Sequence, residues 1–317
     1  MVDFPSAGSS APPGAGGLPL TTLLDVPAPA KLNLFLHVVG RRPDGYHQLQ
    51  TVFRFIDLCD RLDFERTPDG SIQRDGDGLA GLPAAQDLVL RAAHALQQAT
   101  GTRYGARIRY RKVIPAGGGL GGGSSDAATT LIALNRLWGT GLRRAELLRL
   151  ALPLGADVPV FVFGQAAFAQ GIGEDLAPIS LPPQAYLVMH PDASVSTAAV
   201  FNDPDLTRDS ESVKISVFAD WQTQHSGLFG RNDLETVVCR QQPMVDQLLA
   251  TLRGAGLAAR MTGSGSCVFV GFSDARLARV QRNQIIGKMH DLPDVVINGS
   301  WLCQGLDDHP LRDWVMD

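Results

Sequence analysis

The chain has 317 residues, of which 44% are hydrophobic and 19% charged, and its formal net charge is −4 at pH 7. This length favours two domains, and this composition is typical of a globular protein. Such an acidic balance gives no support for a nucleic-acid partner, because nucleic-acid-binding domains usually carry a basic excess. No apolar run reaches the length of a membrane span, so we expect no membrane partner either.

The four cysteines are scattered, with no CxxC pair and no histidine nearby at metal-ligand spacing. This distribution favours reduced thiols in a cytoplasmic protein over a disulfide framework or a zinc site. Residues 1–22 are rich in Gly, Pro, Ala and Ser and contain no Lys or Arg. They resemble neither a secretory signal nor a transit peptide, and we predict a disordered tail.

The first regular element predicted is a strand over residues 30–40, where apolar and polar residues alternate. The alternation predicts one buried face and one face that carries Lys31, Asn33 and His37. A Pro- and Asp-Gly-containing turn leads to a second, longer strand over residues 49–64. Residues 87–100 have the pattern of a helix closed by Gly101, and residues 106–114 alternate again as a strand.

Residues 124–138 and 143–155 are predicted to form two successive helices, followed by a helix start or a turn that leads into short strands. Beyond them we expect a strand over 185–191, the start of a helix at 196–201 and an irregular polar segment over 203–226. We expect a proline-broken helix over 232–256, a strand–turn–strand unit over 258–272 and a further helix over 273–286. Strands in antiparallel-looking pairs with helices between them predict an α+β fold. We place the domains at residues 23–178 and 179–317.

The most informative stretch lies between the strand at 106–114 and the helix that follows it: PAGGGLGGGSS, residues 115–125. A P-loop would require Lys directly after the last glycine, where Ser124 stands. A dinucleotide fold would require a second parallel strand with an acidic residue about 20 residues on, and two helices follow instead. The remaining interpretation is an anion cradle, in which glycine N–H groups and the helix N-terminus bind phosphate, most simply that of a nucleotide.

At this loop, and at four other blocks in the same order, the sequence resembles the GHMP kinases. The blocks are PAKLNLFLHVVGRRPDGYHQLQTVF, PAGGGLGGGSSDAA, LGADVPVFV, AQGIGEDL and MTGSGSCVF, and the resemblance extends from about Pro27 to about Leu311. It is strongest to those members that phosphorylate a small molecule carrying cytidine diphosphate. The resemblance implies an N-terminal domain like domain 2 of ribosomal protein S5, a ferredoxin-like C-terminal domain, ATP as co-substrate and Mg²⁺.

The resemblance also implies roles for individual residues. Asp157 matches the catalytic base, although a lone Asp at this place would more simply be an N-cap or turn residue. Lys31 matches its electrostatic partner. The residues matching the ATP site are Lys112, Pro115, Ala116, Gly117, Gly118, Gly119, Leu120, Gly121, Gly122, Gly123, Ser124 and Ser125.

The acceptor site implied by the resemblance combines residues that are distant in the sequence. Tyr46 and Phe201 match aromatic residues that stack on the two faces of cytosine, and His47 matches a residue that hydrogen-bonds its edge. The full set is Asn33, Tyr46, His47, Thr197, Phe201 and Gly265.

Asp87 departs from the pattern, because relatives often carry Asn there, and we leave it out of the site. Two rival functions stay open: another GHMP-type small-molecule kinase, and a non-catalytic nucleotide- or dinucleotide-binding protein. The sequence assigns neither metal ligands nor an oligomeric state.

Overall fold

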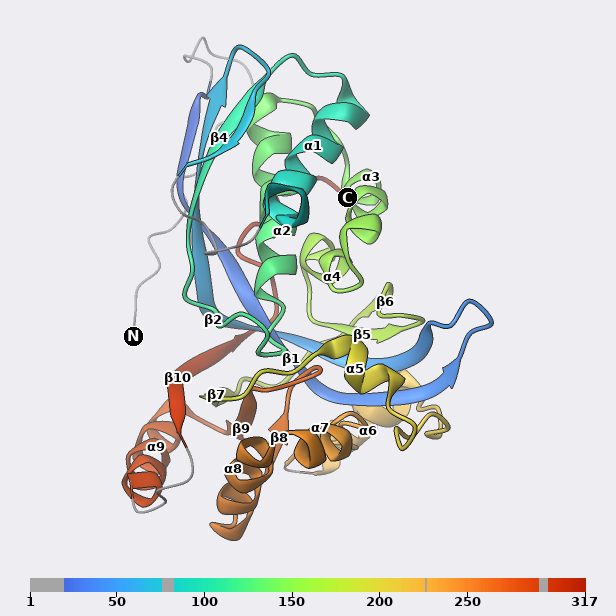
Figure 1. Ribbon diagram of the computed structural model, residues 1–317, viewed down its shortest axis with the longest axis vertical. Coiled ribbons are helices and arrows are strands. Elements are labelled where there is room, and N and C mark those ends of the chain that lie inside the picture. Colours follow the sequence, from blue (N-terminus) through green and yellow to red (C-terminus); the bar gives the residue numbers. More distant parts are fainter. Residues whose placement is uncertain (1–19, 76–82, 226, 291–295) are drawn as a thin grey trace.

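The computed structural model of the chain describes residues 20–75, 83–225, 227–290 and 296–317. Most of the predicted N-terminal tail therefore lies outside the described residues. Over the described residues the chain forms a ten-stranded sheet with helices packed against it (Figure 1). This arrangement confirms the α+β expectation.

A long antiparallel hairpin forms the backbone of the structure. Strand β1 spans Thr22–Arg41 and strand β2 spans His47–Thr67. The register of the pair shifts between Pro29 and Ala30 and again between Asn33 and Leu36. Such irregularities bend a strand and redirect its side chains, and here they lie beside Lys31 and Asn33.

One sheet connects the two halves of the chain. Its main path runs β3-β4-β2-β10-β7-β9-β8, with β1 and β5 also paired to β2 and β6 paired to β5. All pairs are antiparallel except β3 with β4. The remaining strands are β3 (Ile72–Arg74), β4 (Gly105–Arg111), β5 (Ala167–Gln170), β6 (Asp175–Pro178), β7 (Ala185–Pro191), β8 (Ala259–Met261), β9 (Val268–Phe272) and β10 (Ile297–Leu306).

The helices divide into two groups (Figure 1). Helices α1 to α4 cover one face of the upper part of the sheet, and α5 to α9 surround its lower part. Their bounds are α1 (Leu88–Thr100), α2 (Gly122–Trp138), α3 (Arg144–Ala151), α4 (Val158–Phe163), α5 (Thr197–Asn202), α6 (Ile215–Gln224), α7 (Glu235–Gln241), α8 (Pro243–Gly254) and α9 (Ala275–His290). Short 3-10 turns lie at Ala84–Gln86, Leu152–Leu154 and Arg312–Trp314.

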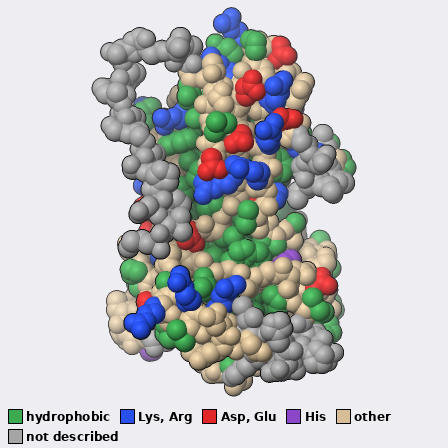
Figure 2. Space-filling view, turned by 90° about the vertical axis from the view of Figure 1, so that its left-hand side faces the viewer, with side chains coloured by type: hydrophobic (Ala, Val, Ile, Leu, Met, Phe, Trp, Pro, Cys, Tyr) green, Lys and Arg blue, Asp and Glu red, His purple; other side chains and the backbone are tan. Residues whose placement is uncertain are grey.

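The opposite face of the upper sheet is shown in Figure 2, where basic and acidic side chains are interspersed. Three arginines at alternate positions of β4, Arg107, Arg109 and Arg111, are exposed, and each forms an ion pair. Because each arginine meets a carboxylate, this face is not a basic patch for a polyanion.

The predicted elements are confirmed with three corrections. The prediction of a single buried face on the first strand is wrong, because Lys31, Asn33 and His37 are buried together with the apolar face. Residues 203–226 are not wholly irregular, since they contain α6. The sequence reasoning did not find two strands, β3, which pairs with β4, and β10, which pairs with both β2 and β7.

The domain limits at 23–178 and 179–317 stay a prediction. The structure adds that the chain crosses between the two halves more than once. Leu311 and Val315 belong to the hydrophobic cluster of the N-terminal half, with β2 and α2. The separation of the halves is therefore spatial and not a single cut in the sequence.

Candidate active site

A cavity of about 850 Å³ lies where the β1–β2 hairpin, the glycine loop, the start of α4 and α5 meet. Its wall contains every residue predicted for the site except Ser125 and Gly265. Segments separated by more than 100 residues therefore meet in one place.

Lys31 and Asp157 face each other in this cavity. The Lys31 Nζ lies 3.3 Å from Asp157 Oδ2, and the lysine is buried while the Asp157 side chain is 39% exposed. Asp157 takes the N-cap position of α4 but makes no side-chain capping bond. The interpretation of this residue as a simple N-cap is therefore not supported, and its carboxylate is available to the cavity.

Asn33 positions the Lys31 ammonium from the same face of β1. Its Oδ1 accepts a hydrogen bond of 2.5 Å from Lys31 Nζ, and its Nδ2 donates to Thr51 Oγ1 at 2.9 Å. The Asn33 backbone N–H donates to Thr262 Oγ1 at 2.9 Å. This chain of bonds holds Lys31 between the hairpin and the turn that follows β8.

The glycine loop is held by the elements on both sides of it. The Lys31 backbone N–H donates to Leu120 O at 3.0 Å, and the Cys267 N–H donates to Gly118 O at 3.1 Å. Gly117, Gly119 and Gly121 have φ of 72°, 75° and 72°, a region that favours glycine. Alternate residues of the loop thus need glycine for the backbone conformation itself.

Lys112 lies beside this loop between two buried carboxylates. Its Nζ donates to Asp126 Oδ2 at 2.5 Å and also to Asp60 Oδ2. Asp60 Oδ1 accepts the backbone N–H groups of Val113 and Ile114. Burial raises the pKa of Asp126 to about 7, against the opposing effect of the Lys112 ammonium. The two carboxylates fix the ammonium in the cavity wall, where it can meet an anion.

The residues predicted to bind cytosine come together. The rings of His47 and Phe201 stack at 5.0 Å between centroids, with 29° between their planes. Tyr46 precedes His47, lines the same cavity and is 60% exposed. The Tyr46 ring is therefore open to the cavity, where it can contact a ligand.

Thr197 and the turn between β8 and β9 also meet. Thr197 Oγ1 and Ser264 Oγ share a hydrogen bond of 2.7 Å. Within this turn Gly263 and Ser264 line the cavity, whereas Gly265 packs against Met261 and Val238 behind it. Gly265 itself is therefore not part of the cavity wall, and its contact with the substrate stays a prediction.

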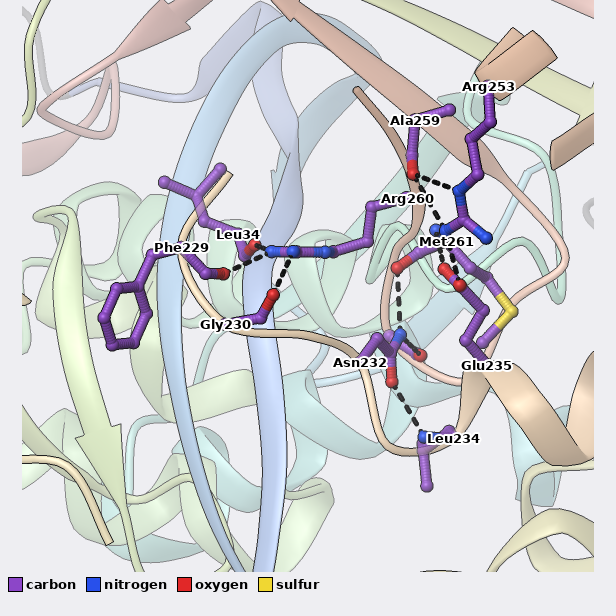
Figure 3. Close-up of polar contacts among 11 residues, drawn as sticks. Leu34, Phe229, Gly230, Asn232, Leu234, Glu235, Arg253, Ala259, Arg260 and Met261 are labelled. Carbon is purple, nitrogen blue, oxygen red and sulfur yellow. Dashed lines mark hydrogen bonds and ion pairs between the residues drawn. The ribbon is translucent and has the colours of Figure 1, made fainter. Parts of the chain in front are cut away.

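The turn is held in place by the polar network of Figure 3. The Arg260 guanidinium donates to the carbonyl oxygens of Leu34, Phe229 and Gly230. Asn232 Nδ2 donates to Met261 O at 2.9 Å and Gly263 O at 2.8 Å. Burial lowers the pKa of Arg260 to about 10. Arg260 connects β1 to β8, and Asn232 fixes the start of the turn.

Two further residues lie at the starts of helices and outside the cavity wall. Ser125 is buried at the start of α2, away from the cavity wall, so its contact with ATP stays a prediction. Asp87 caps α1 by accepting from Val89 N at 2.9 Å, and it pairs with Arg74 at 2.8 Å. These bonds explain the carboxylate at this position without any role in binding.

Sequence reasoning missed several residues of the site. Thr51 and Asp60 lie on β2, which the sequence predicts only as a strand, with no motif that marks either residue. Asp126 could have been noticed, since it is an acidic residue among buried apolar residues of α2. Phe53 lies below the Lys31 ammonium, 5.4 Å from Nζ to its ring centre.

Comparison with known proteins agrees with this geometry. Residues 87–165 match the family described as GHMP kinases N terminal domain, and residues 218–284 match GHMP kinases C terminal. The chain is 59% identical over 300 residues to a protein of Bordetella parapertussis named 4-diphosphocytidyl-2-C-methyl-D-erythritol kinase, covering 93% of this chain and 99% of that one. It is 58% identical to the protein of the same name from Cupriavidus necator, with 83% and 89% covered.

Solved structures give the same result. A crystal structure of 4-(cytidine 5'-diphospho)-2C-methyl-D-erythritol kinase is 32% identical, with a TM-score of 0.72, covering 90% of this chain and 98% of that one. A homoserine kinase of Cytophaga hutchinsonii shares the fold at 17% identity, with a TM-score of 0.63 and 91% and 95% covered. The chain is a kinase, and it belongs to the GHMP kinases and, within them, to the family of 4-diphosphocytidyl-2-C-methyl-D-erythritol kinases.

Proposed function

We propose that this kinase transfers the γ-phosphoryl group of ATP to the 2-hydroxyl of 4-diphosphocytidyl-2-C-methyl-D-erythritol. The products are the 2-phosphate of that compound and ADP, in the methylerythritol phosphate route to isoprenoids. The observation that carries the proposal is the Lys31–Asp157 pair, which lies in one cavity with both a phosphate-type loop and a stacked aromatic pair.

Different residues of the cavity have different roles in phosphoryl transfer. The glycine loop and the α2 N-terminus hold the ATP phosphates through backbone N–H groups, and Lys112 adds a fixed positive charge. Asp157 accepts the proton of the acceptor hydroxyl as it attacks. Lys31 stabilises the negative charge that develops on the transferred group.

We propose Mg²⁺ as the counter-ion of ATP, and the residues present fit it. Mg²⁺ prefers oxygen ligands and commonly takes one or two protein groups together with substrate phosphates and water. Ser124 lines the cavity, and Asp126 Oδ1 is buried at the same helix start with no hydrogen-bond partner among the described residues. The ion would neutralise phosphate charge. No larger acidic or histidine cluster is found in the described part of the chain, which is consistent with a metal held mainly by the nucleotide.

The part of the cavity that we propose to bind the cytosine of the acceptor substrate is formed by Tyr46, His47 and Phe201. The two aromatic rings can stack on a pyrimidine from its two faces, and the histidine can hydrogen-bond its edge. We therefore propose the cytidine diphosphate compound as the small-molecule partner. The proposal includes no nucleic-acid partner and no membrane partner.

We also propose a cytoplasmic location, supported by the cysteines. All four thiols are free, and burial raises the pKa of Cys59 and of Cys239 to about 12. Unpaired thiols are usual in a reducing compartment. Separately, no helix of the described residues combines the length and apolarity needed to cross a bilayer.

A coupled assay of ADP release tests the function. The purified protein is given ATP with the cytidyl compound, mevalonate, homoserine or galactose in separate reactions. We expect turnover with the cytidyl compound at least 100-fold above that with the others, about 3 kcal/mol of discrimination. Comparable turnover with another acceptor would assign the chain to a different GHMP activity. Saturable NAD binding without ATP turnover would favour a non-catalytic protein.

A further inference from the structure

One arginine outside the predicted site joins the two sides of the acceptor pocket. The Arg208 Nε donates to His47 Nε2 at 3.0 Å. The same guanidinium donates to the carbonyl oxygens of Phe201 at 3.0 Å, Asp203 at 2.7 Å and Leu206 at 3.0 Å. Arg208 therefore contacts His47 at the start of β2 and Phe201 in α5, two cavity-lining residues separated by more than 150 positions.

This contact determines the chemical form of His47. A guanidinium can only donate, so His47 Nε2 must be the unprotonated ring nitrogen. Burial, followed by the charges of Arg208 and Arg41, lowers the pKa of His47, so the ring is neutral at pH 7. The single proton of the neutral ring then lies on Nδ1, which makes no hydrogen bond with the described residues. His47 is left with one free donor.

The free Nδ1–H donor of His47 can hydrogen-bond the cytosine base of the phosphoryl-acceptor substrate. Cytosine presents two hydrogen-bond acceptors on its edge, N3 and O2, and a neutral imidazole with its proton on Nδ1 can donate to either. With the other tautomer, or with a ring turned away from Phe201, this bond is lost. The bond from Arg208 selects the useful tautomer and keeps the ring stacked.

We propose that Arg208 is a positioning residue for the acceptor base: it holds the His47 ring against Phe201 in the tautomer that leaves Nδ1–H free to donate. This inference rests on the proposed function, since it takes the cytidine end of the acceptor as the ligand. It adds a residue whose effect on binding passes through His47.

A purely structural role for Arg208 would be to attach the segment 203–214 to the hairpin, and a matched control exists for that role. Gln50 attaches the same segment: its Nε2 donates to Val213 O at 3.1 Å, and its Oε1 accepts from Val213 N at 2.7 Å. Gln50 is buried but is not part of the cavity wall. Gln50→Leu thus removes a comparable attachment without touching His47.

The first experiment measures Michaelis constants for the wild type, Arg208→Met and Gln50→Leu with ATP and the cytidyl acceptor. We expect Arg208→Met to raise KM for the acceptor by about tenfold, the equivalent of one lost hydrogen bond, with KM for ATP within twofold of wild type. Gln50→Leu should leave both constants within about twofold. Equal rises in the two variants would overturn the proposal in favour of simple attachment of the segment.

The second experiment is a double-mutant cycle with His47→Ala. If Arg208 acts through His47, Arg208→Met should raise KM by less than about twofold in the His47→Ala background. A tenfold rise in both backgrounds would show independent action and overturn the inference.

A third measurement does not depend on the substrate. Nitrogen NMR of the imidazole distinguishes the two neutral tautomers, and we expect His47 of the wild type to be protonated on Nδ1. In Arg208→Met the ring should shift toward a mixture of tautomers. A wild-type His47 protonated on Nε2 would contradict the inference. Absence of turnover by the wild type with the cytidyl acceptor would instead contradict the proposed function, and the NMR result would be unaffected.

Discussion

Asp157 shows how a single side chain is kept available for chemistry. Aspartate at a helix N-cap usually accepts a hydrogen bond from a backbone N–H two or three residues on. Here the carboxylate makes no such bond and lies 3.3 Å from the Lys31 ammonium. Its oxygens therefore keep acceptor capacity for a hydroxyl proton, while the positive charge beside them is held by Asn33.

The role of Asp157 is tested by Asp157→Asn. The substitution keeps the shape of the side chain and removes the base, so we expect turnover to fall by about 10²–10⁴-fold. KM for ATP should change by less than about twofold, because the loop is untouched. Steady-state kinetics measure both. As a control, Asp175→Asn changes an exposed carboxylate in β6 and should leave turnover at the wild-type level. A decrease in turnover of less than threefold in Asp157→Asn would contradict the assignment of Asp157 as the base.

The stacking residues are tested by Tyr46→Ala and Phe201→Ala. Stacking on an aromatic ring contributes roughly 1–3 kcal/mol per base, so KM for the acceptor should rise about tenfold or more in each variant. KM for ATP should stay unchanged. Tyr104→Ala, which removes an aromatic ring beside Arg66 and outside the cavity, serves as control. A rise in KM for ATP instead would mean that the two nucleotide sites are exchanged.

The importance of His47 itself is tested by substrate choice. Hydrogen bonds to a base edge can distinguish cytosine from uracil, whereas stacking cannot. His47→Ala should therefore lower the preference for the cytidyl over the uridyl compound by about tenfold, measured as the ratio of kcat/KM values. An unchanged ratio would remove His47 from base recognition.

At the residue scale, sequence could predict what these side chains are but not how each is held. Lys31 and Asn33 were expected on a polar face, because two-residue periodicity reports only local alternation. Their burial depends on Asp157 and Thr262, which come from distant parts of the chain. Arg208 gave no sequence signal at all, since its role arises from a contact with His47 across 161 positions.

At the scale of elements, two positions of the glycine loop require glycine for different reasons. Gly117 has positive φ, and a Cβ added there would meet no atom within 4 Å. Gly119 also has positive φ, but a Cβ there would lie 2.1 Å from Thr262 O. The first glycine thus borders open space in the cavity, and the second allows the loop to touch the turn after β8.

These two positions predict different outcomes for the same substitution. Gly117→Ala should leave the protein folded and raise KM for ATP about tenfold, since an alanine at positive φ costs roughly 1–2 kcal/mol or shifts the loop. Gly119→Ala should lower the melting temperature by several degrees, because a backbone atom must move. Kinetics and thermal unfolding measure the pair. An unchanged KM for ATP in Gly117→Ala would contradict the cradle.

Most elements were predictable because strong periodicity or glycine punctuation marked them. Helix α2 begins at Gly122, inside the glycine-rich stretch and two residues before the predicted start, and it ends before Gly139, as the pattern indicated. Strand β10 was not predicted because its sequence, INGSWLCQGL, contains an Asn-Gly pair typical of turns and no strict alternation. It is a strand because β7 pairs with residues 297 and 299–304 and β2 pairs with residues 305–306, and tertiary pairing overrides local preference.

For the molecule as a whole, buried ionisable groups predict how stability changes with pH. Burial lowers the pKa of His37, His47 and His190, and it lowers the pKa of His309 to about 3. Below about pH 6.5 the unfolded chain binds protons that the folded chain does not, so these four groups make stability fall as pH falls. Buried Asp126, with its pKa raised to about 7, acts in the opposite direction over the same range.

We expect the free energy of unfolding, measured by urea denaturation, to be lower at pH 5 than at pH 7. His309→Asn keeps an acceptor for Leu311 N and removes the titrating ring, so the slope below pH 6.5 should decrease by up to about 1.4 kcal/mol per pH unit. Asp126→Asn should make the slope steeper. Identical slopes in the wild type and His309→Asn would contradict the assignment of a buried neutral histidine.

The return of residues 311–317 to the N-terminal half has a consequence for synthesis of the chain. The Arg144 backbone N–H donates to Met316 O at 2.8 Å, its guanidinium donates to the carbonyl oxygens of Arg312 and Val315, and Leu311 and Val315 fill the cluster around α2. On the ribosome, the ATP-loop half emerges long before these residues do. We therefore expect its hydrophobic cluster to stay incomplete while residues 179–310 are added, an interval in which exposed hydrophobic surface favours aggregation.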